Sequence, residues 1–244
     1  MRRTAALACA LAPALAYGGA PFQTDDPSVV AAGHAEILVF HQSTLAGDAR
    51  GGTLAGLEVH FGVVERLEID VTAPLAFVRS SAGGSSYGYG DTTLGVKYRL
   101  LDETDTVPAV SAVPKLVVPT GRAGRDLGAG GAQVLLALSV QKSVAGVQSY
   151  ATAGYWLNRA PRGRDYAVLG WQVQRPVSEH WTLGVEAFLA APPSDGQATS
   201  TGFNIGGYYT IDEHNQLLFS AGRGLRNVEQ TDRASVYLGY QASF

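Results

Sequence analysis

The chain has 244 residues, which is enough for one large domain or two smaller ones. Charged residues make up only 16% of it and 30 residues are glycine, a composition with little solvated surface that favours a single all-β domain. The net charge of -3 gives no basic surface for nucleic acid, so no nucleic-acid partner is expected.

Residues 1–16 have the pattern of a secretory signal peptide. A positive start at Arg2 and Arg3 precedes a short apolar run, and a small-x-small cleavage site ends at Ala16. The cysteine of the chain, Cys9, lies inside this segment, so the exported protein is expected to form no disulfide or thiolate site. No later run reaches about 18 apolar residues, so no transmembrane helix is expected. Such a chain is periplasmic, secreted or a membrane barrel.

Residues 17–33 contain prolines and the polar run TDDPS, which predicts an extended segment on the periplasmic side. From residue 34 to residue 244 apolar and polar side chains alternate in about twelve runs, the pattern of antiparallel strands with one apolar face. The expected strands are 34–45, 53–64, 67–77, 91–100, 108–119, 133–141, 147–158, 166–176, 181–190, 202–211, 216–224 and 234–244.

The stretch 91–100 shows the alternation most clearly, because Leu94 and Val96 face one way while Lys97 and Arg99 face the other. Glycine-rich residues 80–90 and 119–131 are interpreted as loops. Short connections near residues 65, 104, 145, 179 and 213 alternate with longer ones near residues 49, 85, 125, 162, 195 and 228. A meander with short turns at one rim and long loops at the other is typical of an outer-membrane barrel, whereas a soluble sandwich does not require it.

Aromatic residues fall near strand ends, where the interfacial girdles of membrane barrels lie. These residues are Tyr98, Tyr155, Trp171, Trp181, Tyr209 and Tyr240. The chain also ends in an alternating strand with Tyr240 and Phe244 on its apolar face, which resembles the signal read by the outer-membrane assembly machinery. The predicted fold class is all-β: a transmembrane antiparallel up-and-down β-barrel of about 12 strands, placed in the outer membrane of a Gram-negative bacterium. Its expected partners are outer-membrane lipid and the assembly machinery.

Several motifs resemble one known family. GYGDTTLGVKYRL at 88–100, PAVSAVPKLVVPTG at 108–121, GAGGAQVLLALSVQKS at 128–143 and YATAGYWLN at 150–158 are similar to the outer-membrane barrels named after the MetA pathway of phenol degradation. The lead-in FQTDDPSVVAAGHAEI also resembles the start of that family. The resemblance covers most of the exported chain. It implies a barrel, a transport role for aromatic or other small hydrophobic compounds, and no catalytic residues to carry over.

Charged residues fall on the faces that point away from lipid, and therefore into the lumen of a barrel. They are Glu36, Glu58, Glu68, Asp70, Lys97, Arg99 and Lys115. Acids and bases lie on neighbouring strands, which predicts a salt-bridge cluster near the short-turn rim. Such a cluster could rigidify a barrel too narrow to be empty, or it could form a charged constriction that selects solutes, since twelve strands lie between plugged and open sizes.

Aromatic residues of the later strands are also expected to face the lumen. They are Tyr150, Trp156, Phe188, Tyr208 and Tyr237. They could form a path for an aromatic small-molecule solute, or they could be packing. The predicted function is an outer-membrane channel for small solutes, with aromatic or hydrophobic compounds as the candidate class.

Two other classes compete with the channel. A barrel hydrolase resembling outer-membrane phospholipase needs a serine and a histidine within reach, and His34, His41 and His60 could each meet a serine, but no local motif of that enzyme is present. We therefore expect no enzyme, no cofactor and no metal site. A secreted β-sandwich acting as a binding module would be released without detergent.

Overall fold

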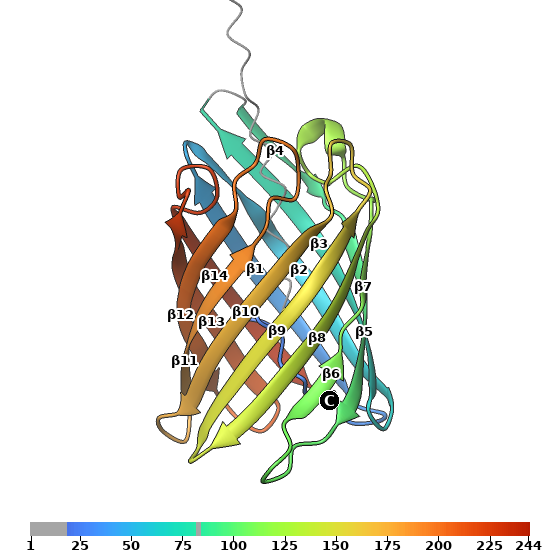
Figure 1. The fold of residues 1–244 in the computed structure, drawn as a ribbon, viewed down its shortest axis with the longest axis vertical. Helices are drawn as coiled ribbons and strands as arrows, with labels where there is room; N and C mark the ends of the chain where they lie inside the picture. The colour runs from blue at the N-terminus through green and yellow to red at the C-terminus, as the bar shows by residue number, and fades with distance from the viewer. Residues whose placement is uncertain (1–18, 82–83) are drawn as a thin grey trace, which may run out of the picture.

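The computed structural model describes residues 19–81 and 84–244, and they form one closed antiparallel sheet (Figure 1). The expected signal peptide, residues 1–16, lies outside the described residues. In the described part, no helix has the length and apolar character needed to cross a membrane. The sheet closes because β1 (Ala35–Ala46) pairs with β14 (Ala234–Ser243), which removes the free edges that an open sheet would have. The alternative of a two-sheet sandwich is therefore wrong.

The remaining strand segments follow one another around the wall. They are β2 (Ala49–Val64), β3 (Leu67–Ser80), β4 (Gly84–Tyr89), β5 (Thr92–Leu101), β6 (Ala109–Ala112), β7 (Lys115–Val118), β8 (Gln133–Val144), β9 (Val147–Asn158), β10 (Tyr166–Pro176), β11 (Trp181–Ala190), β12 (Ser200–Thr210) and β13 (Asn215–Arg226).

Two pairs of these segments each make a single crossing of the wall. β4 and β5 both pair with β3 and are separated at Gly90 and Asp91, while β6 and β7 both lie between β5 and β8 and are separated at Val113 and Pro114. The 14 segments therefore amount to a barrel of 12 strands, which confirms the predicted fold class.

The apolar faces point outward, as the alternation predicted. Leu94, Val96, Tyr98 and Leu100 of β5 are exposed on the outer wall, whereas Lys97 between them is only 7% exposed. The same holds around the barrel, so a continuous apolar band surrounds it, far larger than the patches that soluble monomers expose. This band is the surface that meets the hydrocarbon of the outer membrane.

The predicted alternation of short and long connections is only partly right. The connections that contain residues 119–131, 159–165, 191–199 and 227–233 are long and share one rim, which is the upper rim in Figure 1. At that same rim, however, β1 and β2 are joined by Gly47 and Asp48 alone. Residues 47–52 were expected to form a loop, but residues 49–52 already belong to β2 and pair with both neighbouring strands, because backbone N–H and C=O groups form the ladder whatever the side chain.

Within the stretch 80–90 that was expected as a loop, residues 84–89 form a strand. β3 continues to Ser80 and turns back into β4, whose Tyr87 and Tyr89 lie opposite Phe77 and Leu75. This hairpin rises above the neighbouring strands (Figure 1). The Gly-Ser composition predicted turns, but tyrosines at alternate positions give the segment a strand period of two.

Candidate functional site

The N-terminal segment, residues 19–33, lies inside the barrel. We expected this stretch as an extended segment in the periplasm. Instead Phe22, Thr24 and Asp25 are each at most 2% exposed, and the chain passes through the lower half of the lumen before β1 begins at the short-turn rim. Figure 1 shows it as the dark blue trace between the strands. The lower half of the lumen is therefore occupied by the chain's own N-terminal segment.

Asp25 makes the main ionic contact of this segment. Its Oδ1 lies 2.8 Å from Nζ of Lys97 on β5, and its Oδ2 lies 3.3 Å from Nζ of Lys115 on β7. Its backbone N–H donates to Oγ1 of Thr152 on β9 at 3.0 Å, and its backbone carbonyl accepts from the hydroxyls of Thr152 and Ser139. One aspartate thus connects the segment to four segments of the wall.

A second anchor is Glu186 on β11, which is only 2% exposed. Its Oε1 accepts from the backbone N–H of Gln23 at 2.8 Å and from the hydroxyl and backbone N–H of Thr24, while its Oε2 accepts from Nδ2 of Asn204 at 2.7 Å. Gly170 on β10 provides the space for Thr24, because a Cβ there would lie 2.3 Å from the threonine Oγ1. Sequence reasoning missed Glu186, although it lies two residues before the predicted inward Phe188.

The backbone carbonyls of the segment are also held by the wall. The Pro27 oxygen accepts from Nε of Arg99 at 2.7 Å and from Oγ of Ser111 at 2.6 Å. The Pro21 oxygen accepts from Oγ of Ser220 at 2.6 Å. These contacts satisfy backbone groups that would otherwise be buried without partners.

The predicted acidic residues lie in the lumen but do not pair with lysine or arginine as we expected. Nδ1 of His60 lies 2.8 Å from Glu68 and its Nε2 lies 3.3 Å from Glu58, and Glu68 also accepts from the backbone N–H of Val30 at 2.7 Å. Glu36 accepts from Gln241 at 2.8 Å. Lys97 and Lys115 instead form ion pairs with Asp25, because the Asp25 carboxylate lies within 3.3 Å of both ammonium groups.

Asp70 is buried on β3 directly opposite Gly95 on β5. A Cβ at position 95 would lie only 1.9 Å from Oδ2 of Asp70, so this carboxylate occupies the space that the glycine leaves. Its Oδ1 has no hydrogen-bond partner in the part of the chain that the structure describes.

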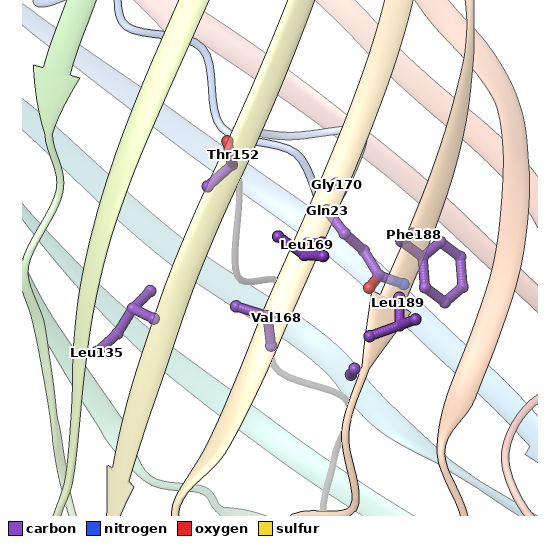
Figure 2. Close-up of a pocket in the computed structure, with 9 residues that line it drawn as sticks. Gln23, Leu135, Thr152, Val168, Leu169, Gly170, Phe188 and Leu189 are labelled. Carbon is purple, nitrogen blue, oxygen red and sulfur yellow. The ribbon is translucent and has the colours of Figure 1, made fainter.

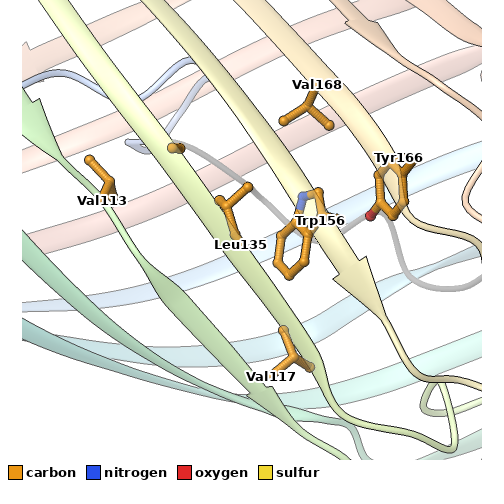
Figure 3. Packing of buried hydrophobic residues seen from close by; sticks show 7 residues of the cluster. Val113, Val117, Leu135, Trp156, Tyr166 and Val168 are labelled. Carbon is orange, nitrogen blue, oxygen red and sulfur yellow. The ribbon is translucent and has the colours of Figure 1, made fainter.

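All five predicted lumen aromatics are on the inner wall, but they do not form one continuous path. Trp156 stacks on Tyr166 with ring centroids 6.1 Å apart, within an apolar cluster of Val113, Val117, Leu135, Ala137 and Val168 (Figure 3). Tyr237 stacks on Phe40 at 5.5 Å in a second cluster, against which Tyr208 packs. Tyr150 instead hydrogen-bonds Gln148 and Gln174.

Phe188 lines a small cavity beside the segment, together with Leu135, Val168, Thr152 and Gln23 (Figure 2). Its volume is about 20 Å³, which admits roughly one water molecule. A solute larger than water would therefore fit this cavity only if its lining side chains or the segment moved.

Solved structures of outer-membrane channels share this fold. The COG4313 outer membrane channel from Pseudomonas putida F1 matches at 17% identity and a TM-score of 0.75, covering 90% of this chain and 98% of that one. The KdgM porin in complex with disordered oligogalacturonate matches at 10% identity and a TM-score of 0.57, covering 86% and 99%. The NanC porin matches at 9% identity and a TM-score of 0.58, covering 86% and 98%.

No curated protein matches the chain. A family model described as "Putative MetA-pathway of phenol degradation" matches residues 19–242, which include both the N-terminal segment and the barrel. The chain is an outer-membrane β-barrel, and it belongs to this family.

Proposed function

We propose that this barrel passes small apolar or aromatic solutes across the outer membrane, and that the N-terminal segment must be displaced for them to pass. The apolar cluster around Trp156 is the observation that supports this most. The lumen holds charged and polar side chains, as the interiors of water-filled porins do, but this cluster adds a stacked tryptophan and tyrosine among aliphatic side chains. Such a surface suits a flat apolar solute.

The relatives agree with this proposal. The COG4313 protein is named as a channel and the other two structures as porins, and the family description refers to phenol degradation. These names suggest passage of a small solute, and the phenol pathway suggests an aromatic one.

We propose that the barrel is not a hydrolase. The ring of His60 bonds two glutamates, and the rings of His34, His41 and His180 bond backbone carbonyl oxygens. Because both ring nitrogens of His60 contact glutamates, this histidine has no nitrogen left to take the proton of a serine hydroxyl.

Fluorescence provides a test of aromatic binding. The chain has 3 tryptophans, so replacing Trp171 and Trp181 by phenylalanine leaves Trp156 as the reporter inside the lumen. Phenol should then quench the emission saturably, and a sugar of similar size should not. The further change Trp156→Phe should abolish the signal. Equal quenching by both solutes would contradict an aromatic preference.

Passage itself is tested by ion current in planar bilayers. A variant that lacks residues 19–33 should conduct, and phenol added to either side should reduce its current, because the solute occupies the same apolar wall. A current that is unaffected by phenol would contradict the proposal.

We also propose that the assembly machinery recognises the last strand. Tyr240 and Phe244 face outward and are 42% and 66% exposed, so they are accessible on the outer wall. Phe244→Ala should lower the yield of folded, heat-modifiable barrel in cells. An unchanged yield would rule out a role for this side chain.

A further inference from the structure

Two arginines lie side by side on the outer wall at the long-loop rim. Arg79 on β3 continues the outward series of Val71, Leu75 and Phe77. Arg50 on β2 is its direct cross-strand partner, so both side chains share the outward face, and both are exposed. Side chains that lie directly opposite on adjacent strands have Cβ atoms only about 5 Å apart.

This pair carries two positive charges without a counter-charge from the chain. In residues 19–81 and 84–244, no carboxylate lies within 4.0 Å of either guanidinium group. Asp48, the acid next to this pair in the sequence, accepts a hydrogen bond from Ser81 instead. Nε of Arg50 donates to Oγ of Ser43 at 2.8 Å, which fixes the side chain but adds no charge. Like charges in this position repel each other unless an anion lies between them.

The depth of the pair in the membrane follows from its neighbours. On the same face, the row formed by Phe77 and Tyr87 lies two residues below Arg79, or about 7 Å along the strand. His41 stacks on Phe77 with ring centroids 6.1 Å apart. Aromatic rows of this kind mark the boundary between hydrocarbon and headgroups. The arginines therefore lie at the level of the headgroups of the outer leaflet.

We propose that Arg50 and Arg79 bind a phosphate group of lipid A, the phosphorylated glycolipid of the outer leaflet, with the Phe77 and Tyr87 rings beneath it. Guanidinium groups form paired hydrogen bonds with phosphate oxygens, and two of them on adjacent strands can hold one phosphate from both sides. The rings supply an apolar surface for the first part of the acyl chains. This site lies outside the lumen and is independent of any solute that passes through it.

The test is native mass spectrometry of the detergent-purified barrel with lipid A that carries two phosphates, one phosphate or none. The wild-type protein should bind the phosphorylated forms and lose at least about tenfold in affinity for the form without phosphate. This comparison requires no variant, so it holds even if a substitution disturbs folding. Equal binding of all three forms would overturn the proposal.

The double change Arg50→Gln and Arg79→Gln should reduce the affinity for phosphorylated lipid A by about tenfold or more. Arg175→Gln is the matched control for each of the two single changes, because Arg175 is an exposed arginine near the short-turn end of β10 and its replacement removes one positive charge from the wall away from the pair. Inorganic phosphate added in excess should not displace the lipid if the rings contribute. An equal loss of affinity in the control, or displacement by free phosphate, would overturn the lipid site.

Discussion

Asp25→Asn should release the N-terminal segment from the lumen. The carboxylate lies 2.8 Å from Lys97 and 3.3 Å from Lys115, and all three side chains are buried. The neutral amide leaves two ammonium groups facing each other without a charge between them. Removing one partner of a buried ion pair costs about 3–5 kcal/mol, which corresponds to a shift of roughly 150-fold to 5,000-fold in the equilibrium between the docked and released segment.

The release is measured in two ways. A thiol introduced by Gln23→Cys reports access to the segment, because Gln23 lines the cavity beside Phe188 and a bulky maleimide reacts with it only after the segment moves. Ion current through single barrels in a planar bilayer reports whether the lumen opens. Both the labelling rate and the open fraction should rise in the Asp25→Asn background.

Asp26→Asn is the matched control. Asp26 is the next residue and carries the same charge, but among residues 19–81 and 84–244 its carboxylate accepts a hydrogen bond from within the segment, from the backbone N–H of Ser28 at 2.7 Å, and from no strand of the wall. A second control replaces Asp25 by leucine and both lysines by methionine, which should restore docking because a neutral buried set removes the uncompensated charge. If Asp25→Asn labels and conducts like the wild type, the ion pairs do not hold the segment.

Three further changes test other parts of the structure. Gly95→Ala should destabilise the barrel by about 1–3 kcal/mol in urea unfolding, because the new Cβ would meet the Asp70 carboxylate. Asp91 accepts from two backbone N–H groups of the 119–131 loop at 2.9 and 2.7 Å, so Asp91→Ala should speed tryptic cleavage of that loop while the barrel stays folded. Burial raises the pKa of the Asp232 carboxyl group in the folded barrel. The free energy of unfolding should therefore fall as the pH rises from the pKa of this group in the unfolded chain to its pKa in the folded barrel. A carbon-13 NMR titration of Asp232 should show the raised pKa.

The strand pattern predicted which residues face the lumen, because the side-chain direction alternates with a period of two. Trp156 and Phe188 were expected inside and are at most 9% exposed. The same parity applied to β11 would also have identified Glu186. The two anchors differ in this respect: Glu186 follows from a strand pattern, but Asp25 belongs to a stretch that has no period.

The position of the N-terminal segment could not be predicted from local pattern. The polar run TDDPS has the composition of a solvent-exposed extended segment, and in isolation it would be exposed to solvent. Its burial depends on hydrogen-bond donors and acceptors that distant strands bring together only when the barrel closes, such as Ser220 of β13 and Ser111 of β6. Burial of a polar segment is favourable only where such partners exist, and the sequence does not reveal them before the register is known.

The two interpretations of the lumen charges describe the same residues in two states. With the segment docked, Asp25 neutralises Lys97 and Lys115, and the Pro27 carbonyl engages Arg99, so these cations stabilise packing. Once the segment leaves, the same three cations on β5 and β7 lose these partners, and β5 lies next to the acids of β3. We therefore expect a charged constriction only in the open state, where ion selectivity has to be measured to detect it. The Asp25→Asn barrel is consequently the background in which the selectivity of Lys97 and Arg99 has to be measured.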